Sequence, residues 1–332
     1  MDRSSDMEVL RNAVEWLDAG EAVTLVTVAQ TWGSSPRRPG SLMVIHGDGR
    51  FTGSVSGGCV EDDLVQRVMK GEFDDTSPQL LEYGVGNATL QKVGLPCGGR
   101  LTLLVEHIDS AAQLRTLLQV MESRQLIRRH VCLNTGESSL QAGQDGNGFY
   151  FDGDNLTKVF GPGLRLLLVG AGELARRVAQ LAQTLDYAVT LCDPRPEYAC
   201  NWQVEGVDFI TTSPTQAVAQ FQPDGRTAIL ALSHTPAIDD DALAAALQAE
   251  AFYVGALGSM KNQAARRRRL QNKGLSALQL ERLHGPVGLA IGSRTPAEIA
   301  VAIMAALIAE QNSAALSLIE VHSLSQAHSA HG

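Results

Sequence analysis

Three features that would place the chain in other classes of protein are missing from its sequence. No apolar run approaches the roughly eighteen residues that a membrane-spanning helix needs, and residues 1–12 are too polar for a secretory signal. There are five cysteines, an odd number without regular spacing, which indicates reduced thiols rather than a disulfide framework. We therefore expect a cytoplasmic protein that has no membrane partner.

An excess of basic charge is also missing. The chain has 27 Lys and Arg residues against 36 Asp and Glu residues, and its formal net charge of −9 argues against nucleic acid or an anionic membrane surface as a partner. The one basic cluster, Arg266–Arg269, falls in a helical run and spreads around the helix axis. We expect it to form a solvated face.

The length of 332 residues is sufficient for two domains that each bury a core. We predict a first domain over 1–133 and a connecting segment over 134–163, where Gly, Asp, Asn and Ser are frequent and a short hairpin is expected around Phe149–Phe160. A second domain is expected over 164–312. The tail at 313–332, rich in Ser, Ala and His, is predicted to be disordered.

The first domain is predicted to be a small mixed α/β fold. The pattern Ser5-x-x-Glu8 opens an amphipathic helix, and a second helix is expected over 111–123. Asp48-Gly49 favours a tight hairpin, and His46 at its start is predicted to be solvated. The expected strands are 23–28, 42–45, 51–55, 80–83, 101–105 and 127–133.

The stretch GSVSGGCVEDDL, residues 53–64, places Cys59 at a turn between a strand and a helix. Ser56 can accept hydrogen bonds from the first helical turn, and Gly57 and Gly58 allow close approaches. A helix start favours a thiolate or a bound anion, although the acidic residues from Glu61 onward oppose both unless they point away. The alternative is a small buried cysteine at a tight turn.

Two further glycine-rich connections carry reactive side chains. GLPCGGR, residues 94–100, places Cys97 beside Gly98 and Gly99 and ahead of an apolar strand. TWGSSPRRPG, residues 31–40, joins two strands and holds Arg37 and Arg38 between prolines. Arginine suits phosphate because its planar fork binds two oxygens at once. We interpret the three connections as parts of one pocket for an anionic ligand.

The second domain begins with a dinucleotide-binding pattern. The apolar strand 164–169 leads into Gly170-x-Gly172-x-x-Ala175, and the next strand ends at Asp193, twenty-three positions beyond Gly170. An acidic residue there normally accepts a hydrogen bond from a ribose hydroxyl. Arg195 could instead meet a phosphate, so the pattern does not distinguish NAD from NADP.

Strands and helices continue to alternate after Asp193, which predicts a Rossmann-like, doubly wound parallel sheet. His234 closely follows the strand 228–232, at the edge where such folds bind ligands, and the alternative is a helix cap or an imidazole bonded to the backbone. A helix is expected to begin at Thr295-Pro296, where Thr, Pro and Glu298 form a capping pattern. Cys132, Cys192 and Cys200 lie in or beside strands and are interpreted as packing residues.

Seven segments of the chain together resemble the XdhC/CoxI family of xanthine dehydrogenase accessory proteins. They are TWGSSPRRPG, GSVSGGCVEDDL and LPCGG in the first domain, and VGAGELA, CDPRPEYA, AFYVGALGS and RLHGPVGLAIGSRTPAEIAVAI in the second. The resemblance covers nearly the whole chain except its ends and the connecting segment.

The resemblance implies a chaperone more than an enzyme. Members of the family are understood to bind the molybdenum cofactor (molybdopterin, as a mono- or dinucleotide form), support its sulfuration and deliver it to xanthine dehydrogenase or a related molybdenum hydroxylase. A cysteine desulfurase as a further partner and a homodimer are also expected. A phosphate-bearing pterin with a dithiolene-bound metal calls for backbone N–H groups, arginine and a soft thiolate.

By resemblance, the first domain holds the cofactor. The predicted cofactor-binding residues there are Arg37, Ser56, Gly57, Gly58, Cys59, Glu61, Cys97, Gly98 and Gly99, and the thiols of Cys59 and Cys97 are the candidate metal ligands. In the second domain the predicted cofactor-binding residues are Gly170, Gly172, Ala175, Asp193 and His234, for NAD(P) or another nucleotide. The alternative is an NAD(P)-dependent oxidoreductase with His234 as acid or base. For it the sequence offers neither a Tyr-x-x-x-Lys pair nor a carboxylate that would orient the histidine.

Overall fold

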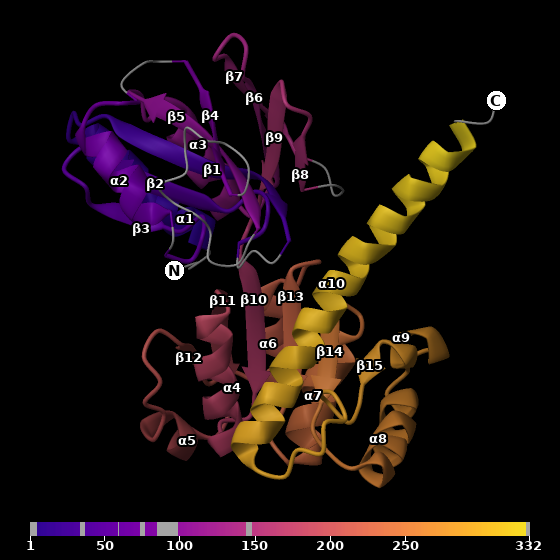
Figure 1. Ribbon diagram of the computed structural model, residues 1–332. Coiled ribbons are helices and arrows are strands. Elements are labelled where there is room, and N and C mark those ends of the chain that lie inside the picture. Colours follow the sequence, from indigo (N-terminus) through magenta and orange to yellow (C-terminus); the bar gives the residue numbers. More distant parts are fainter. Residues whose placement is uncertain are drawn as a thin grey trace. The chain divides into compact units, whose positions relative to one another are not determined.

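The computed structural model describes residues 5–33, 37–58, 60–73, 77–84, 99–143 and 148–329, with side chains described as far as Asn312. The chain divides at Gly163 into two compact units (Figure 1). The first unit runs from Ser4 to Pro162 and the second from Gly163 to the end of the chain.

The first unit is built on an antiparallel five-stranded sheet in the order β3-β2-β1-β5-β4. Alternate side chains of its strands enter two separate cores, because both faces of the sheet are covered. Leu25 and Val44 pack with α1 and α3, whereas Val26 and Ile45 pack with α2. The elements are α1 (Ser5–Asp18), β1 (Val23–Trp32), β2 (Leu42–His46), β3 (Phe51–Gly53), α2 (Glu61–Met69), β4 (Gln79–Tyr83), β5 (Arg100–Ile108) and α3 (Ala112–Glu122).

A four-stranded antiparallel sheet completes the first unit. Its strands are β6 (Ile127–Cys132), β7 (Ser138–Ala142), β8 (Phe149–Phe151) and β9 (Asn155–Phe160), in the order β7-β6-β9-β8. The expected hairpin around residues 149–160 is formed by β8 and β9. A buried, two-pronged ion pair between Arg129 and Glu106, at 3.0 and 2.7 Å, ties β6 to β5. The strands of residues 138–160 thus belong to the first unit.

The second unit is a doubly wound α/β fold, as the sequence predicted. Its six strands are all parallel and lie in the order β12-β11-β10-β13-β14-β15. They are β10 (Leu164–Val169), β11 (Tyr187–Cys192), β12 (Asp208–Ile210), β13 (Thr227–Ala231), β14 (Tyr253–Ala256) and β15 (Leu283–His284). The helices are α4 (Glu173–Thr184), α5 (Pro196–Cys200), α6 (Pro214–Phe221), α7 (Pro236–Ala246), α8 (Met260–Asn272), α9 (Ala277–Glu281) and α10 (Pro296–Ser329).

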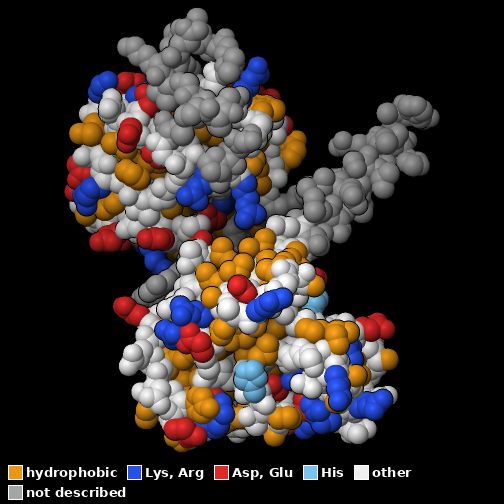
Figure 2. Space-filling model, turned by 60° about the horizontal axis from the view of Figure 1, so that its bottom comes forward, with side chains coloured by type: hydrophobic (Ala, Val, Ile, Leu, Met, Phe, Trp, Pro, Cys, Tyr) orange, Lys and Arg blue, Asp and Glu red, His pale blue; other side chains and the backbone are white. Residues whose placement is uncertain are grey.

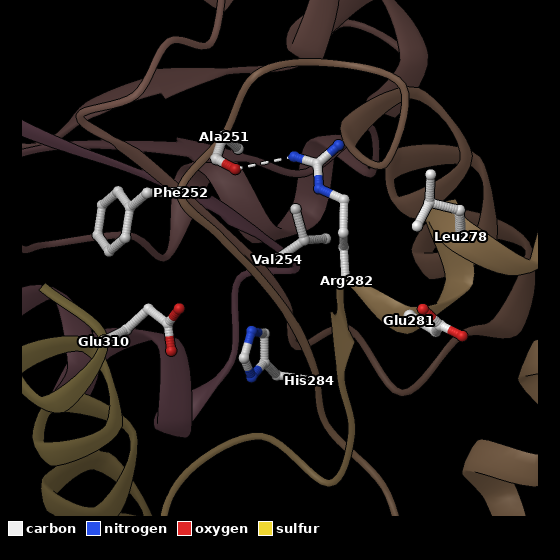
Figure 3. Close-up of a pocket in the computed structure, with 8 residues that line it drawn as sticks. All are labelled: Ala251, Phe252, Val254, Leu278, Glu281, Arg282, His284 and Glu310. Atoms are coloured by element: carbon white, nitrogen blue, oxygen red, sulfur yellow. Dashed lines mark hydrogen bonds between the residues drawn. The ribbon is translucent and has the colours of Figure 1, made fainter. Parts of the chain in front are cut away.

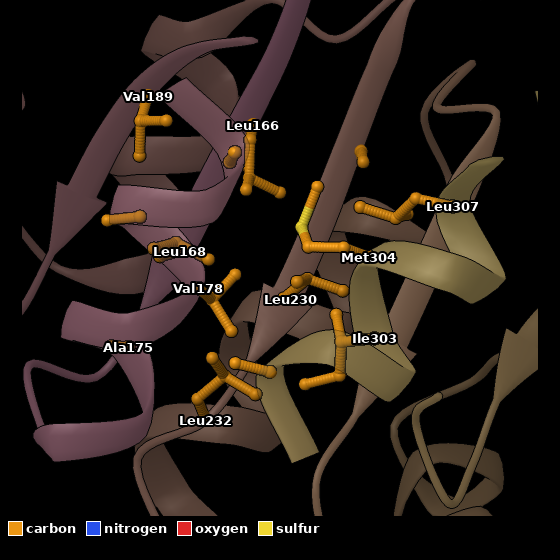
Figure 4. Close-up of a cluster of buried hydrophobic side chains, with 14 of the residues drawn as sticks. Leu166, Leu168, Ala175, Val178, Val189, Leu230, Leu232, Ile303, Met304 and Leu307 are labelled. Carbon is orange, nitrogen blue, oxygen red and sulfur yellow. The ribbon is translucent and has the colours of Figure 1, made fainter. Parts of the chain in front are cut away.

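The apolar run of β10 is explained by cores on both faces of the parallel sheet. Leu166 and Leu168 pack with α4 and α10, in the cluster that includes Val178 and Ile303 (Figure 4). Leu167 and Val169 enter the opposite core. A strand covered by helices on both sides has no solvated face, so alternation disappears from its sequence.

The basic cluster at 266–269 is not the solvated face that the sequence predicted, except at Arg268, which is exposed. Arg266 is buried and its Nη2 lies 3.0 Å from Asp239 Oδ2, while Arg269 Nη2 donates to Asp240 at 3.2 Å. The acids come from α7, the neighbouring helix, a proximity that the local pattern of α8 does not contain. These arginines therefore join two helices.

His46 is also buried, where the sequence predicted a solvated residue. It is 7% exposed, and its Nε2 and Nδ1 lie 2.6 Å from Glu21 Oε2 and 2.8 Å from Asp48 Oδ1. Trp16 meets the imidazole edge-on, with ring centroids 5.4 Å apart. The turn is a hairpin as expected, but α1 covers it through Trp16.

Thr295 and Glu298 form the predicted capping pair at the start of α10. The Thr295 hydroxyl accepts from the Glu298 N–H at 3.3 Å, and the Glu298 carboxylate accepts from the Thr295 N–H at 3.1 Å. The helix continues to Ser329, although the sequence predicted disorder from 313. Among the described residues there is no helix of the length and apolarity that crossing a membrane requires.

Candidate functional site

The three glycine-rich connections of the first unit all begin at one edge of its five-stranded sheet. This edge is formed by the ends of the strands, not by an outer strand. Because neighbouring strands are antiparallel, the ends of β1, β3 and β4 lie at the same edge as the starts of β2 and β5. Trp32 at the end of β1 pairs with Arg100 at the start of β5, and Tyr83 pairs with the next residue, Leu101. Topology therefore brings the described residues at the ends of the connections that follow β1, β3 and β4 to one place.

Described residues of these connections touch one another. Arg37 Nε donates to Ser54 Oγ at 3.2 Å. A Cβ added to Gly33 would lie 3.4 Å from the Cα of Gly99, and one added to Gly84 would lie 2.5 Å from the Gly99 carbonyl oxygen. Cys59, Cys97 and Gly98 lie outside the described residues. Their place in a shared site remains a prediction.

The carboxylate of Glu61 fills the turn between β3 and α2. It is the first residue of α2 and is 5% exposed. Its carboxylate oxygens accept hydrogen bonds from the hydroxyls of Ser54, at 2.7 Å, and Ser56. Five backbone N–H groups donate to it at 2.9 to 3.2 Å, those of Val55, Ser56, Gly57, Gly58 and Val60. Glu61 thus points into the turn instead of away from it.

Glu61 stays ionised because the turn is built around its charge. Burial alone would raise its pKa, but hydrogen bonds from Ser56, Ser54 and the backbone outweigh burial and hold the pKa well below the usual range. Ser56 Oγ accepts from the Val60 N–H at 3.0 Å, as the sequence predicted. The backbone donors that the sequence offered to a ligand anion are therefore used by the chain itself.

In the second unit, the glycine turn after β10 packs against the turn after β13. Gly170 has φ +100°, and a Cβ there would lie 2.3 Å from the Cα of Ser233. Gly172 caps α4 and has open space around it, while Ala175 is fully buried in the core. His234 follows Ser233, is exposed and has φ +62°. The predicted residues of this unit therefore gather at the carboxyl edge of the sheet.

Asp193 is fully buried and both its oxygens have partners within the chain. Oδ2 accepts from the Ala171 N–H at 2.8 Å, and Arg195 donates from Nε and Nη2 at 2.8 and 2.7 Å. Burial alone would raise the pKa of Asp193, but the bonds from Arg195 and Ala171 outweigh it and lower the pKa. The Arg195 guanidinium lies 3.8 Å over the Tyr198 ring. The sequence placed Arg195 near this site but did not identify it as the partner of Asp193.

Sequence reasoning missed the support of the turn at His234. Asp239 is 1% exposed and accepts from Ser233 Oγ and the Ser233 N–H at 2.6 and 3.0 Å, and Arg266 pairs with its other oxygen. The available signal is an acid in the first turn of α7, which favours contact with the preceding loop.

The second unit has a pocket that holds none of the predicted site residues, and a face on which hydrophobic side chains gather (Figure 2). A pocket of about 360 Å³ beside β14 and β15 includes Phe252, Glu310 and His284 (Figure 3). The imidazole of His284 stacks on the Tyr253 ring, with ring centroids 4.1 Å apart. Figure 2 shows hydrophobic side chains gathered on one face of this unit. Leu289 and Ile291 are among the exposed apolar residues of the second unit, at 44% and 56%.

Comparison with known proteins places the chain in a family. The model of the XdhC and CoxI family matches residues 16–84, and the XdhC Rossmann domain matches residues 166–307. The chain belongs to the XdhC and CoxI family. The first match includes the positions of Arg37, Cys59 and Glu61 and ends before Cys97.

Relatives within this family match the chain over nearly its full length. The molybdenum cofactor insertion chaperone PaoD of Escherichia coli is 31% identical, over 90% of this chain and 86% of its own. A probable xanthine dehydrogenase subunit of Bacillus subtilis is 27% identical, over 88% of this chain and 94% of its own. A crystal structure described as a xanthine dehydrogenase from Bacillus halodurans has a TM-score of 0.75 at 23% identity, over 93% of this chain and 96% of its own, and so shares the fold.

Proposed function

We propose that this protein binds the molybdenum cofactor and inserts it into a client enzyme. The observation that carries the proposal is the convergence of three glycine-rich connections at one edge of the five-stranded sheet. These connections bear Arg37, Cys59 and Cys97. The name of the relative PaoD, a molybdenum cofactor insertion chaperone, supports the same function.

The residues at this edge suit the chemistry of that cargo. Molybdopterin carries a phosphate and a dithiolene-bound metal, and arginine and thiolate are the side chains that suit these groups. Arg37 is exposed and hydrogen-bonded to Ser54, beside the turn that leads to Cys59. We assign the phosphate to Arg37 and the molybdenum end of the cargo to Cys59 and Cys97.

The client is proposed to be xanthine dehydrogenase or a related molybdenum hydroxylase. The name of the relative from Bacillus subtilis, a probable xanthine dehydrogenase subunit, favours this class. Support of cofactor sulfuration, with a cysteine desulfurase as sulfur donor, and a homodimeric assembly are part of the proposal and rest on the family resemblance alone.

The oxidoreductase alternative receives less support from the second unit. Its glycine turn has the strand-turn-helix context of a dinucleotide site, but Asp193 is fully buried and bound by Ala171 and Arg195. A ribose could reach this carboxylate only after Arg195 had moved. We therefore propose no hydride transfer.

Pterin content tests the proposed function. The protein would be produced in cells that make the cofactor, and the denatured, oxidised extract would be assayed for pterin fluorescence. We expect pterin in the wild-type protein and its loss in Cys59→Ala, while Cys200→Ala, a change at an exposed cysteine of the other unit, retains it. Wild-type protein without pterin would refute the function, and full pterin in Cys59→Ala would refute the site.

A matched pair of arginine variants tests the phosphate contact. Arg37 and Arg38 are adjacent and both exposed, but Arg37 bonds to Ser54. Arg37→Met should lower pterin content about tenfold, equivalent to roughly 1.4 kcal/mol, while Arg38→Met should change it little. Equal effects of the two substitutions would show that only the general charge of this loop matters.

A further inference from the structure

Ser54 links the carboxylate of Glu61 to the guanidinium of Arg37. Its hydroxyl donates to Glu61 Oε1 at 2.7 Å and accepts from Arg37 Nε at 3.2 Å and from the Gly57 N–H at 3.1 Å. A hydroxyl has one proton and two lone pairs. Because Glu61 takes the proton, the lone pairs of Ser54 are directed toward Arg37 and the turn.

The Glu61 carboxylate is fixed where it lies. Glu61 begins α2, and its neighbours Val60 and Leu64 are fully buried in the core between that helix and the sheet. Moving the carboxylate out would require the first turn of the helix to move with it. It would also take the carboxylate acceptor away from the buried N–H groups of Val55 and Ser56, and an unpaired buried donor is costly.

Backbone N–H groups that converge in this way ordinarily bind an anion of a ligand. Here the anion is supplied by the chain, so the phosphate of a ligand has to be bound elsewhere. Arg37, which the same carboxylate helps to orient through Ser54, is the neighbouring cation.

We infer that Glu61 is a positioning residue of the cofactor site. Its carboxylate is the permanent anion of the turn 54–60 and, through Ser54, holds Arg37 where a phosphate can meet it. The inference rests on the proposed function, because the phosphate is that of the cofactor. The competing idea, that the cofactor displaces Glu61 and occupies the turn itself, predicts stronger binding when the carboxylate is removed.

The experiment compares four variants, two at Glu61, one at Ser54 and a control. Glu61→Ala removes the carboxylate and leaves room for formate. Glu61→Gln keeps the size of the side chain, Ser54→Ala keeps the anion but cuts the link to Arg37, and Asp62→Ala changes the adjacent, exposed acid. Pterin content after production in cofactor-making cells and the unfolding temperature would be measured with added formate and with chloride at equal ionic strength.

We expect Glu61→Ala to lose about tenfold in pterin content and to recover it in formate but not in chloride. Formate should raise the unfolding temperature of Glu61→Ala and leave that of the wild type unchanged. Ser54→Ala should lose pterin without recovery in formate, and Asp62→Ala should behave as the wild type. If Glu61→Ala does not fold, Glu61→Gln should fold and carry severalfold less pterin.

Three results would overturn the inference. Pterin at the wild-type level in Glu61→Ala, or in Glu61→Gln where that is the variant that folds, would show that the carboxylate positions nothing. More pterin in Glu61→Ala than in the wild type would favour displacement. An unfolding temperature of Glu61→Ala that formate does not change would show that the turn needs no anion. That last measurement requires no cofactor, so it separates failure of this inference from failure of the proposed function.

Discussion

The carboxylate of Asp193 accepts a 2.8 Å hydrogen bond from the N–H of Ala171, the residue between the two glycines of the turn after β10. In a dinucleotide-binding fold this turn faces the pyrophosphate and the acid faces a ribose. Here Asp193 is bound to the turn and to Arg195. The carboxylate therefore occupies the Ala171 N–H of the turn, and the turn and Arg195 occupy the carboxylate.

The first prediction is that the protein does not bind NADH or NADPH at micromolar concentration. A ribose diol would have to replace the charged bonds that Asp193 receives from Arg195, and neutral hydroxyls are weaker donors than a guanidinium. Titration followed by nicotinamide fluorescence should give no saturable change. A saturable enhancement with either nucleotide would restore the oxidoreductase alternative.

The second prediction concerns the pH dependence of stability. The folded-state pKa of Asp193 is lowered, so its stabilising contribution is complete above the pKa of an unfolded aspartate, near 4, and is lost as the pH falls through the folded-state value. Asp193→Asn should therefore lower the free energy of unfolding by about 3 kcal/mol at pH 7. Denaturant titrations should show the difference from wild type shrinking below about pH 4, and a difference independent of pH would contradict this account.

The third prediction compares two glycines of the same turn. A Cβ at Gly170 would lie 2.3 Å from Ser233 Cα and the residue has φ +100°, whereas Gly172 has an extended backbone and open space. Gly170→Ala should lower the free energy of unfolding by about 3 kcal/mol, and Gly172→Ala by less than about 1 kcal/mol. Urea unfolding would measure both. Similar losses would show that the contact with Ser233 does not set the conformation of the turn.

The sequence predicted the fold well where the signal is local. The run 164–169, Gly170 and the caps at Thr295 and Glu298 each mark an element through its own residues. The parallel, doubly wound sheet of the second unit was predicted from its alternating strands and helices, which allow few topologies.

What the sequence did not reveal are contacts between elements. The acids that pair with the buried Arg266 lie on another helix, and the aromatic ring that covers His46 comes from α1. Glu61 was predicted to belong to the site, but a sequence motif does not specify whether a side chain points into a turn or out of it. These outcomes depend on tertiary neighbours, which a local pattern does not specify.

The fourth prediction follows from the buried cluster at α7 and α8. Arg266 lies against Asp239 and Asp240, both nearly inaccessible to solvent, and Asp240 also pairs with Arg269, so Arg266→Met would leave the buried carboxylate of Asp239 without its counter-charge. We expect a loss of about 3–5 kcal/mol in the free energy of unfolding of the second unit. Arg268→Met, on the exposed side of the same helix, should change it by less than about 0.5 kcal/mol. Thermal unfolding of both variants would decide, and equal stabilities would contradict the assignment.

Cross-linking of Cys59 to Cys97, which measures whether the two thiols lie close together, is the most direct test of the site. Cys132, Cys192 and Cys200 would first be replaced by alanine, and the folded protein would then be treated with a short bis-maleimide and its peptides mapped. Convergence of the three connections predicts an intramolecular cross-link between Cys59 and Cys97 in high yield. Modification of both thiols by separate reagent molecules, with no cross-linked peptide, would contradict a shared site at this edge of the sheet.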